Sequence, residues 1–216
     1  LALIAVDLHL RHYSRYTESI TEFGSQKGFQ LLCRGRVILG TNIQWFDQLG
    51  MDDVETVGGK NASLGEMVSN LSSAGVTVPN GFATTAEAFR EFLAHQGLAD
   101  KINQTLTALD VEDVNALAET GAQIRQWGLD ATLPQALLDD VTQAFILLQD
   151  GNNNLAVAVR SSATAEDLPD ASFAGQQETH LNIQGVENVI HAIKDVFASL
   201  FNNRAISYRV HQGFDH

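Results

Sequence analysis

A pair of glycines stands directly before a lysine at the start of an apolar helical pattern. Gly58 and Gly59 precede Lys60. Glycine lets the backbone approach an anion closely, a helix N-terminus offers free N–H groups, and lysine adds a positive charge. This combination is typical of a phosphate site. It is not a Walker A loop, because Val54 stands where that motif needs its first glycine and Asn61 follows the lysine in place of Ser or Thr.

A second segment carries an arginine and two serines at the end of an apolar strand pattern. Arg160 is followed directly by Ser161 and Ser162. The guanidinium group of arginine suits two-point contact with phosphate oxygens, and hydroxyl groups can donate hydrogen bonds to the same oxygens. This segment is therefore a second candidate for phosphate binding.

Each segment also has a purely structural interpretation. The glycine pair can serve only to start a helix whose lysine is solvated. Arg160 can pair with Glu166, Asp167 or Asp170 and hold the following loop in place. The same three carboxylates resemble a magnesium cluster, but surface carboxylates are usually solvated, and we expect loop ion pairs there. No metal site is predicted within this sequence.

Composition and charge exclude several classes of protein. The chain has 216 residues, 44% of them hydrophobic, and a formal net charge of −13. An acidic chain without a basic stripe does not suit nucleic acid or an anionic membrane surface. The single cysteine, Cys33, excludes an intrachain disulfide, and no apolar run reaches the roughly 18 residues of a membrane span. We therefore expect a soluble, cytoplasmic protein.

Charge is distributed unevenly along the chain. Residues 1–44 contain five basic and three acidic side chains, whereas the remaining residues contain eight basic and 23 acidic ones. The first segment also lacks a sustained hydrophobic period. We predict an atypical leader over residues 1–44 that is non-native or disordered, with an organellar transit peptide and a genuine folded segment as alternatives. The folded domain is then expected over residues 45–216.

Hydrophobic periodicity from residue 45 onward predicts several helices and few strands. Thr84 and Glu87 have capping-box spacing before an apolar stripe that contains Phe89 and Phe92. Clear patterns also predict helices over residues 64–71, 99–108, 111–127, 134–148 and 186–201, and extended segments over 76–78, 155–159 and 179–183. The expected fold class is α+β, with helices around a small, mostly antiparallel sheet.

Three motifs occur in an order that is similar to one enzyme family. They are Gly-Gly-Lys60-Asn-Ala-Ser-Leu-Gly-Glu-Met, Val-Pro79-Asn-Gly-Phe-Ala-Thr-Thr and Val-Arg160-Ser-Ser-Ala-Thr-Ala-Glu-Asp. From about residue 45 to residue 216 the chain resembles the N-terminal ATP-binding region of the phosphoenolpyruvate synthase (pyruvate, water dikinase) family. The likeness continues through residues 174–179 and 201–216, whereas residues 1–44 lie outside it.

The resemblance implies the N-terminal part of an ATP-grasp domain that is incomplete at its C-terminal side. It also implies that Lys60 and Arg160 are the catalytic cations on the ATP phosphates. Gly58, Gly59, Ser161 and Ser162 are the further binding candidates. The family converts ATP, pyruvate and water to AMP, phosphoenolpyruvate and phosphate through a phosphohistidine, in gluconeogenesis.

Much of that machinery is expected downstream of residue 216. This holds for the ligands of Mg²⁺, for the phosphohistidine and for the domain that binds pyruvate. None of the seven histidines stands in the family's phosphohistidine motif. We therefore expect a fragment that does not turn over pyruvate by itself and binds ATP weakly or not at all, because one wall of the cleft is missing. In the full-length form a homo-oligomer is possible.

Three other interpretations stay open. Rifampicin phosphotransferase and pyruvate, phosphate dikinase have similar ATP-binding regions and would use the same Lys60 and Arg160. The third is a structural or interaction fragment without nucleotide affinity. An incomplete sheet would also leave a strand edge unpaired, which favours aggregation or non-native dimers.

Overall fold

The computed structural model describes residues 2–8, 41–71, 74–76, 78–164, 167–168, 171–172 and 178–212. Within these residues the chain forms a five-stranded sheet with the strand order β2-β3-β1-β4-β7, in which every pair is antiparallel. The strands are β1 (Ala2–Leu8), β2 (Ile43–Trp45), β3 (Gly81–Thr84), β4 (Ala156–Ala163) and β7 (Thr179–Gln184). A second, two-stranded sheet pairs β5 (Asp167–Leu168) with β6 (Ala171–Ser172).

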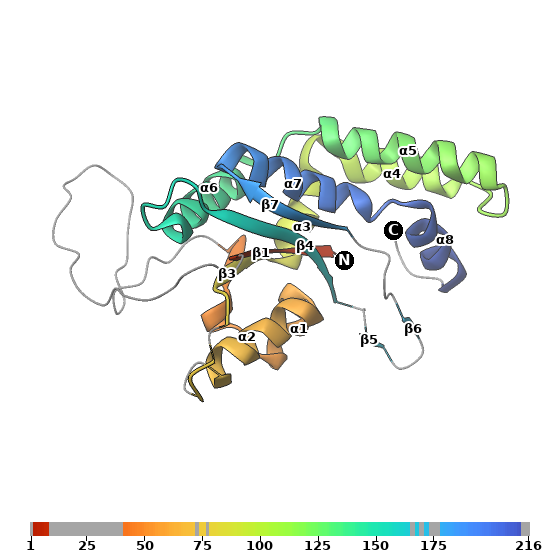
Figure 1. Ribbon diagram of the computed structural model, residues 1–216. Coiled ribbons are helices and arrows are strands. Elements are labelled where there is room, and N and C mark those ends of the chain that lie inside the picture. Colours follow the sequence, from red (N-terminus) through yellow and green to blue (C-terminus); the bar gives the residue numbers. More distant parts are fainter. Residues whose placement is uncertain are drawn as a thin grey trace.

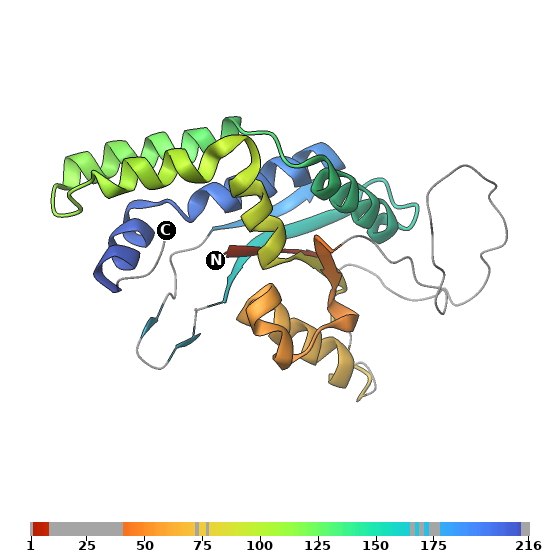
Figure 2. The same ribbon diagram turned by 180° about the vertical axis from the view of Figure 1, so that it is seen from behind.

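Helices cover both faces of the larger sheet (Figures 1 and 2). One face carries two short 3-10 turns, η1 (Phe46–Gln48) and η2 (Met51–Asp53), and two helices, α1 (Val54–Val57) and α2 (Gly59–Leu71). We call it the α2 face. On the side of the other face, the α7 face, lie α3 (Ala86–Ala94), α4 (Leu98–Thr107), α5 (Val114–Asp130), α6 (Gln135–Gln149), α7 (Val186–Ser199) and α8 (Asn203–Gln212). Of these, α3, α6 and α7 contact the strands, whereas α4 packs on α3 and α5, α5 packs on α7, and α8 packs on α5. The turn η4 (His95–Gly97) joins α3 to α4. This arrangement confirms the predicted α+β class.

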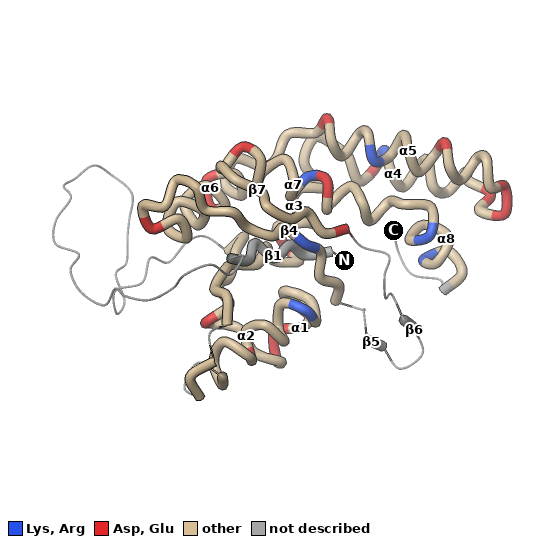
Figure 3. The backbone as a smooth tube through the Cα atoms, viewed as in Figure 1, with Lys and Arg blue, Asp and Glu red and all other residues tan. Residues whose placement is uncertain are grey.

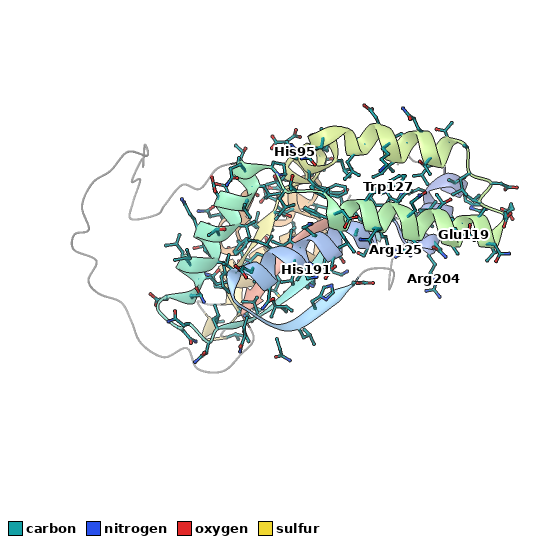
Figure 4. The ribbon with its side chains drawn as sticks, turned by 90° about the horizontal axis from the view of Figure 1, so that it is seen from above. His95, Glu119, Arg125, Trp127, His191 and Arg204 are labelled. Carbon is teal, nitrogen blue, oxygen red and sulfur yellow. The ribbon has the colours of Figure 1, made fainter. Side chains whose placement is uncertain are left out.

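The α7 face holds the main hydrophobic core. Phe89 and Phe92 of α3 both contact Phe197 of α7, with ring centroids 4.9 and 5.3 Å apart. All three rings are almost completely buried. The apolar stripe around Phe89 and Phe92 is therefore core packing, as the sequence indicates. Between α4 and α5, Lys101 lies over the ring of Trp127, which is partly buried against the same core (Figure 4).

Most helix predictions are confirmed within a few residues. The helices predicted over 99–108, 111–127 and 134–148 correspond to α4, α5 and α6, with ends that differ by one to three residues. The helix predicted over 64–71 is the later part of α2, and Gly75 follows it with φ +80°. There, the N–H of Val76 donates to the carbonyl oxygen of Leu71 at 3.1 Å, a bond typical of a glycine-terminated helix.

Two predicted elements are wrong in extent. The single helix expected over 186–201 is two helices, because α7 ends at Ser199 and α8 begins at Asn203. His211 lies in α8. The extended segment expected over 76–78 is not a strand at its two described residues, and β3 begins at Gly81.

The cap of α3 is Thr85 and not Thr84. The Thr85 hydroxyl accepts a hydrogen bond from the N–H of Ala88 at 3.2 Å and donates one to the carbonyl oxygen of Thr41 at 3.1 Å. Thr84 is instead the last residue of β3 and pairs with Ile43 of β2. An N-cap residue needs an extended backbone directly before the helix, and only Thr85 occupies that place.

Part of the predicted leader belongs to the sheet. Residues 2–8 form β1, which lies between β3 and β4, whereas residues 9–40 lie outside the described residues. The strand β2 begins at Ile43, just before the predicted boundary at residue 45. The non-native or disordered character of residues 1–44 stays a prediction. Among the helices that the structure describes, none is both long and apolar enough to cross a membrane.

Candidate functional site

The glycine pair of the first motif lies at the junction of α1 and α2. Gly58 has φ +80° and ψ 159°, a backbone conformation that residues with a side chain rarely adopt. A Cβ atom at Gly58 would lie 2.3 Å from Oγ of Ser162 and 2.9 Å from its carbonyl carbon. Glycine is therefore required here both by the backbone angle and by the close approach to β4.

A buried polar contact joins the two predicted segments. The backbone N–H of Asn61 donates to Oγ of Ser162 at 3.3 Å, and the side-chain amide of Asn61 donates to the carbonyl oxygen of Val57 at 2.8 Å. Asn61 and Ser162 are both completely buried. Because these bonds lie at the first turn of α2, they hold the start of that helix against β4.

Arg160 and Ser162 project from the same face of the sheet. Successive side chains of a strand point to opposite faces, so residues 160 and 162 share one face and residue 161 points to the other. Ser162 contacts α2, so this shared face is the α2 face. Arg160 is half-buried there, and Lys60 is half-buried in the first turn of α2. Both predicted cations are therefore carried by the two elements that meet at this contact (Figure 3).

Ser161 has different surroundings from Ser162. It is almost completely buried and points toward the α7 face, where Val157 and Val159 of the same strand contribute to the main core. Its N–H donates to the carbonyl oxygen of Glu178 at 3.3 Å. The structure thus brings the Gly58–Gly59 turn, with Lys60 directly after it, against Ser162. Arg160 lies on the same face of β4 as Ser162, whereas the Ser161 side chain lies on the opposite side of the sheet.

The arrangement suits a polyanion and does not suit a metal ion. Lys60 lies in the first turn of a 13-residue helix, where N–H groups and the helix dipole favour negative charge, and Arg160 lies on the strand that this turn contacts. Across the described part of the chain, no group of three or more His, Cys, Asp or Glu side chains could hold a metal ion. The predicted loop ion pairs of Glu166, Asp167 and Asp170 lie outside the residues whose side chains are described.

A separate polar pocket lies at the β7 edge of the sheet. Its volume is about 320 Å³, and its lining includes His180 and Asn182 of β7 and His191 and Asp195 of α7. The His191 side chain is 70% exposed and its Nε2 lies 3.9 Å from Oδ2 of Asp195, as expected for the polar side of a helix (Figure 4). None of the predicted site residues lines this pocket.

Sequence reasoning missed the structural role of Asn61. In the sequence, Asn61 stands out only because it replaces the Ser or Thr of a Walker A loop. An asparagine at a helix start can donate a side-chain hydrogen bond to the preceding turn, and this is the signal that the sequence offers. Its partner Ser162 lies 101 positions away, and no spacing rule predicts such a contact.

Fold and site together define an α+β domain in which a cationic helix start is held against a strand. The chain belongs to the family described as "Pyruvate phosphate dikinase, AMP/ATP-binding domain", which matches residues 54–216. The predicted resemblance is thereby confirmed, and the relatives below bear the name phosphoenolpyruvate synthase.

Three relatives illustrate the similarity. The chain is 72% identical over 170 residues to the phosphoenolpyruvate synthase of Pseudomonas aeruginosa (strain UCBPP-PA14), covering 79% of this chain and 22% of the relative. It is 59% identical over 174 residues to that of Escherichia coli (strain K12), covering 81% and 22%. For Neisseria meningitidis serogroup B the identity is 62% over 174 residues, covering 80% and 22%. The chain thus spans about a fifth of the length of these relatives.

Proposed function

We propose that the α2 face of this domain binds the triphosphate of ATP between the start of α2 and the strand β4. The observation that carries the proposal is the buried contact between Asn61 and Ser162, which holds the two cation-bearing segments together. The family description, which names AMP and ATP, supports the same ligand.

The proposed roles follow from the chemistry of each group. Lys60 and Arg160 would hold the phosphate oxygens and stabilise negative charge as the pyrophosphoryl group leaves AMP, which is the electrostatic work expected in phosphoryl transfer. Gly58 and Gly59 would let the main chain approach the phosphates closely. Ser161 and Ser162 are secondary binding candidates: the Ser162 hydroxyl lies on the α2 face, whereas the Ser161 side chain lies on the other.

The chain is proposed to be the ATP-binding part of a longer phosphoenolpyruvate synthase. That enzyme would convert ATP, pyruvate and water to AMP, phosphoenolpyruvate and phosphate in the cytoplasm. Residues 45–216 would be the N-terminal part of an ATP-grasp domain, with residues 1–44 as an added leader. The parts that bind pyruvate, carry the phosphohistidine and set any homo-oligomer would lie outside this chain.

Magnesium is proposed only for the longer protein. Mg²⁺ prefers carboxylate, phosphate and water oxygens, whereas the described site offers two cations, an amide and hydroxyl groups. These residues do not fit the metal, so its ligands are assigned to a downstream part of the enzyme.

A second candidate reaction belongs to the same phosphotransfer class. The family is described by the name of pyruvate phosphate dikinase, and a rifampicin phosphotransferase would use the same two cations. The names of the relatives favour the synthase. A purely structural fragment would instead show no ATP response at the α2 face.

The test uses the chain extended to full length. Lys60→Ala and Arg160→Ala are each expected to abolish AMP formation from ATP and pyruvate while circular dichroism stays that of the parent. Near-normal AMP release by both variants would contradict the phosphate assignment. The 216-residue chain itself is expected to form no phosphoenolpyruvate from ATP and pyruvate.

A further inference from the structure

The central strand of the larger sheet comes from outside the part of the chain that matches the family. β1 pairs with β3 over residues 5–7 and with β4 over residues 2–8, antiparallel to both. Both neighbours lie within the matched residues 54–216, and β1 does not. Two family strands therefore flank a position that a segment from elsewhere fills.

This position cannot stay empty without a large cost. All four residues of β3 are buried, as are Val157, Val159 and residues 161–163 of β4. Without β1, the main-chain groups of β3 and β4 that now pair with it would lose their partners, and each of these that water does not reach would cost about 1–3 kcal/mol. Relatives that contain β3 and β4 in this arrangement need a strand between them, and this chain spans only 22% of the Pseudomonas relative.

No tight turn joins β1 to either of its neighbours. Among the described residues the next strand is β2 at Ile43, and the pairing partners of β1 follow only at Gly81 and Ala156. Hairpin strands are held in register by their turn, whereas β1 is held by its ladders of hydrogen bonds with β3 and β4. Such a strand can be exchanged for another without breaking a local connection.

We propose that the space between β3 and β4 is a strand-acceptor site that binds an extended, mostly apolar peptide segment. In this chain β1 occupies the site, and in the longer relatives a segment that this chain does not span would occupy it. The occupant is about seven residues long, lacks proline and lies antiparallel to both walls. It is recognised mainly through the main chain, as in β-strand addition.

The site has consequences for the neighbouring strand. In the register of β1 with β4, Ala5 lies opposite Arg160 and Leu3 lies opposite Ser162. The occupant therefore fixes the backbone of β4 at Ser162, which contacts α2, and at Arg160 on the same face. This coupling follows from the pairing alone and does not depend on nucleotide binding.

The first test vacates the site in the complete 216-residue chain. Ala5→Pro removes a ladder hydrogen bond and disfavours a central strand, so β1 should leave. The probe is a synthetic peptide with the sequence of residues 1–8, with two added lysines and a fluorophore. We expect saturable binding to the Ala5→Pro chain, a rise in its Tm on binding, and at least tenfold weaker binding to the parent chain. The same peptide with proline at its fifth position should not bind.

A locked variant supplies a control that stays folded. Ala5 and Ala83 lie directly opposite each other in the ladder, a spacing that suits a disulfide. The Ala5→Cys, Ala83→Cys chain in a Cys33→Ser background should form an intramolecular disulfide and, when oxidised, bind no peptide. Should the Ala5→Pro chain be unfolded alone, recovery of its native circular dichroism on refolding with the peptide would support the site.

Several results would overturn the proposal. These are equal peptide binding by the locked chain and the Ala5→Pro chain, unchanged stability of Ala5→Pro without peptide binding, and failure to refold with the peptide. Disulfide-linked dimers in place of monomers on a non-reducing gel would overturn the placement of β1 within its own chain.

Discussion

The two faces of the sheet are stabilised in different ways. On the α7 face, large apolar side chains from α3, α6 and α7 interlock, with Phe89, Phe92 and Phe197 in mutual contact. On the α2 face, the buried hydrophobic cluster is small. There, glycines let the backbone of α2 and of the turn before it pack closely against neighbouring segments. A Cβ atom on Gly65 of α2 would lie 2.4 Å from that of Leu49, and one on Gly58 would meet Ser162.

The two faces therefore have different roles: the α7 face mainly stabilises the fold, and the α2 face also positions the proposed anion site. The α7 face is stabilised by the apolar area that it removes from water. This stabilisation changes little when one helix shifts slightly against another. The α2 face depends on glycines and a buried polar contact, which hold the start of α2 at one place on β4. Substitutions on the α7 face should therefore change the free energy of unfolding, whereas those on the α2 face should also change anion binding.

The largest expected loss is at Phe197. Phe197→Ala removes a ring that is 1% exposed and contacts two other rings, so it should lower the free energy of unfolding by about 3–5 kcal/mol. Chemical denaturation measures this loss. The control is Ile146→Ala on α6, where the side chain is 58% exposed and the change should stay within about 0.5 kcal/mol. Equal losses of unfolding free energy in the two variants would mean that the aromatic cluster does not stabilise the α7 face.

The next prediction compares two glycine-to-alanine variants, which distinguishes the cost of a steric collision from the cost of backbone strain. Gly58 and Gly185 have similar backbone angles, φ +80° and ψ 159° against φ +81° and ψ 145°. A Cβ atom on Gly185 meets nothing within 4 Å. Gly185→Ala should therefore cost only the strain, about 1–3 kcal/mol, and Gly58→Ala should cost a further 1–3 kcal/mol from the collision with Ser162. The approach of α2 to β4 would be looser than described if the two variants had the same Tm.

A smaller effect is expected at Asn61. Its side-chain amide donates to the carbonyl four residues earlier, and Asn70 makes the same bond to Glu66 at 3.0 Å on the exposed side of α2. Asn61→Ala should lose about 1–3 kcal/mol because it leaves a buried carbonyl without its donor, whereas Asn70→Ala should lose less than about 0.5 kcal/mol. Equal thermal stability of the two variants would show that the bond of Asn61 is not buried in solution.

The smallest effect concerns Arg209 at the end of the α7 face. Its Nη1 donates to the carbonyl oxygen of Leu200 at 2.8 Å, and its guanidinium lies over the Phe201 ring at 5.3 Å. Arg209→Met should cost about 1 kcal/mol at pH 7, whereas Arg204→Met, at an exposed position of α8, should cost less than about 0.5 kcal/mol.

The pH dependence of Arg209 has a definite sign. Burial lowers its pKa from the usual value of arginine to about 10, because desolvation disfavours the charged form. The folded protein therefore binds this proton less tightly than the unfolded chain does. Below pH 10 both states are protonated and the desolvation cost is complete, and this cost decreases as the pH rises above about 10 toward the usual pKa of arginine. Parent stability relative to Arg209→Met should increase over that range, and a decrease would contradict the assigned burial.

Local patterns predicted the helices of the α7 face well. The period of Val189, Ile193, Val196 and Phe197 indicates a buried stripe, and these residues are all in the core of α7. The break after Ser199 was missed because the apolar pattern continues through Leu200 and Phe201, which are buried in the turn between α7 and α8. Burial continues there although the helix does not.

The α2 face was predicted in its residues but not in its geometry. The sequence predicts phosphate binding from the types and order of four residues, Gly58, Gly59, Lys60 and Arg160. It does not predict how the two segments that carry them lie relative to each other. The contact between Asn61 and Ser162 joins positions 101 residues apart and depends on which face of the sheet each β4 side chain points to. One step along the strand, from Ser162 to Ser161, reverses that face. The central place of β1 was likewise not predictable, because its partners lie far away along the chain.

The central claim is that ATP binds at the α2 face through Lys60 and Arg160. The most direct test is a titration of the 216-residue chain with ATP, followed residue by residue through its amide NMR signals. We predict weak, saturable shifts confined to the amides of residues 58–61 and 160–163, which Lys60→Ala and Arg160→Ala each strongly reduce. Shifts concentrated in the pocket between β7 and α7, or shifts in residues 58–61 and 160–163 that both variants retain in full, would contradict the claim.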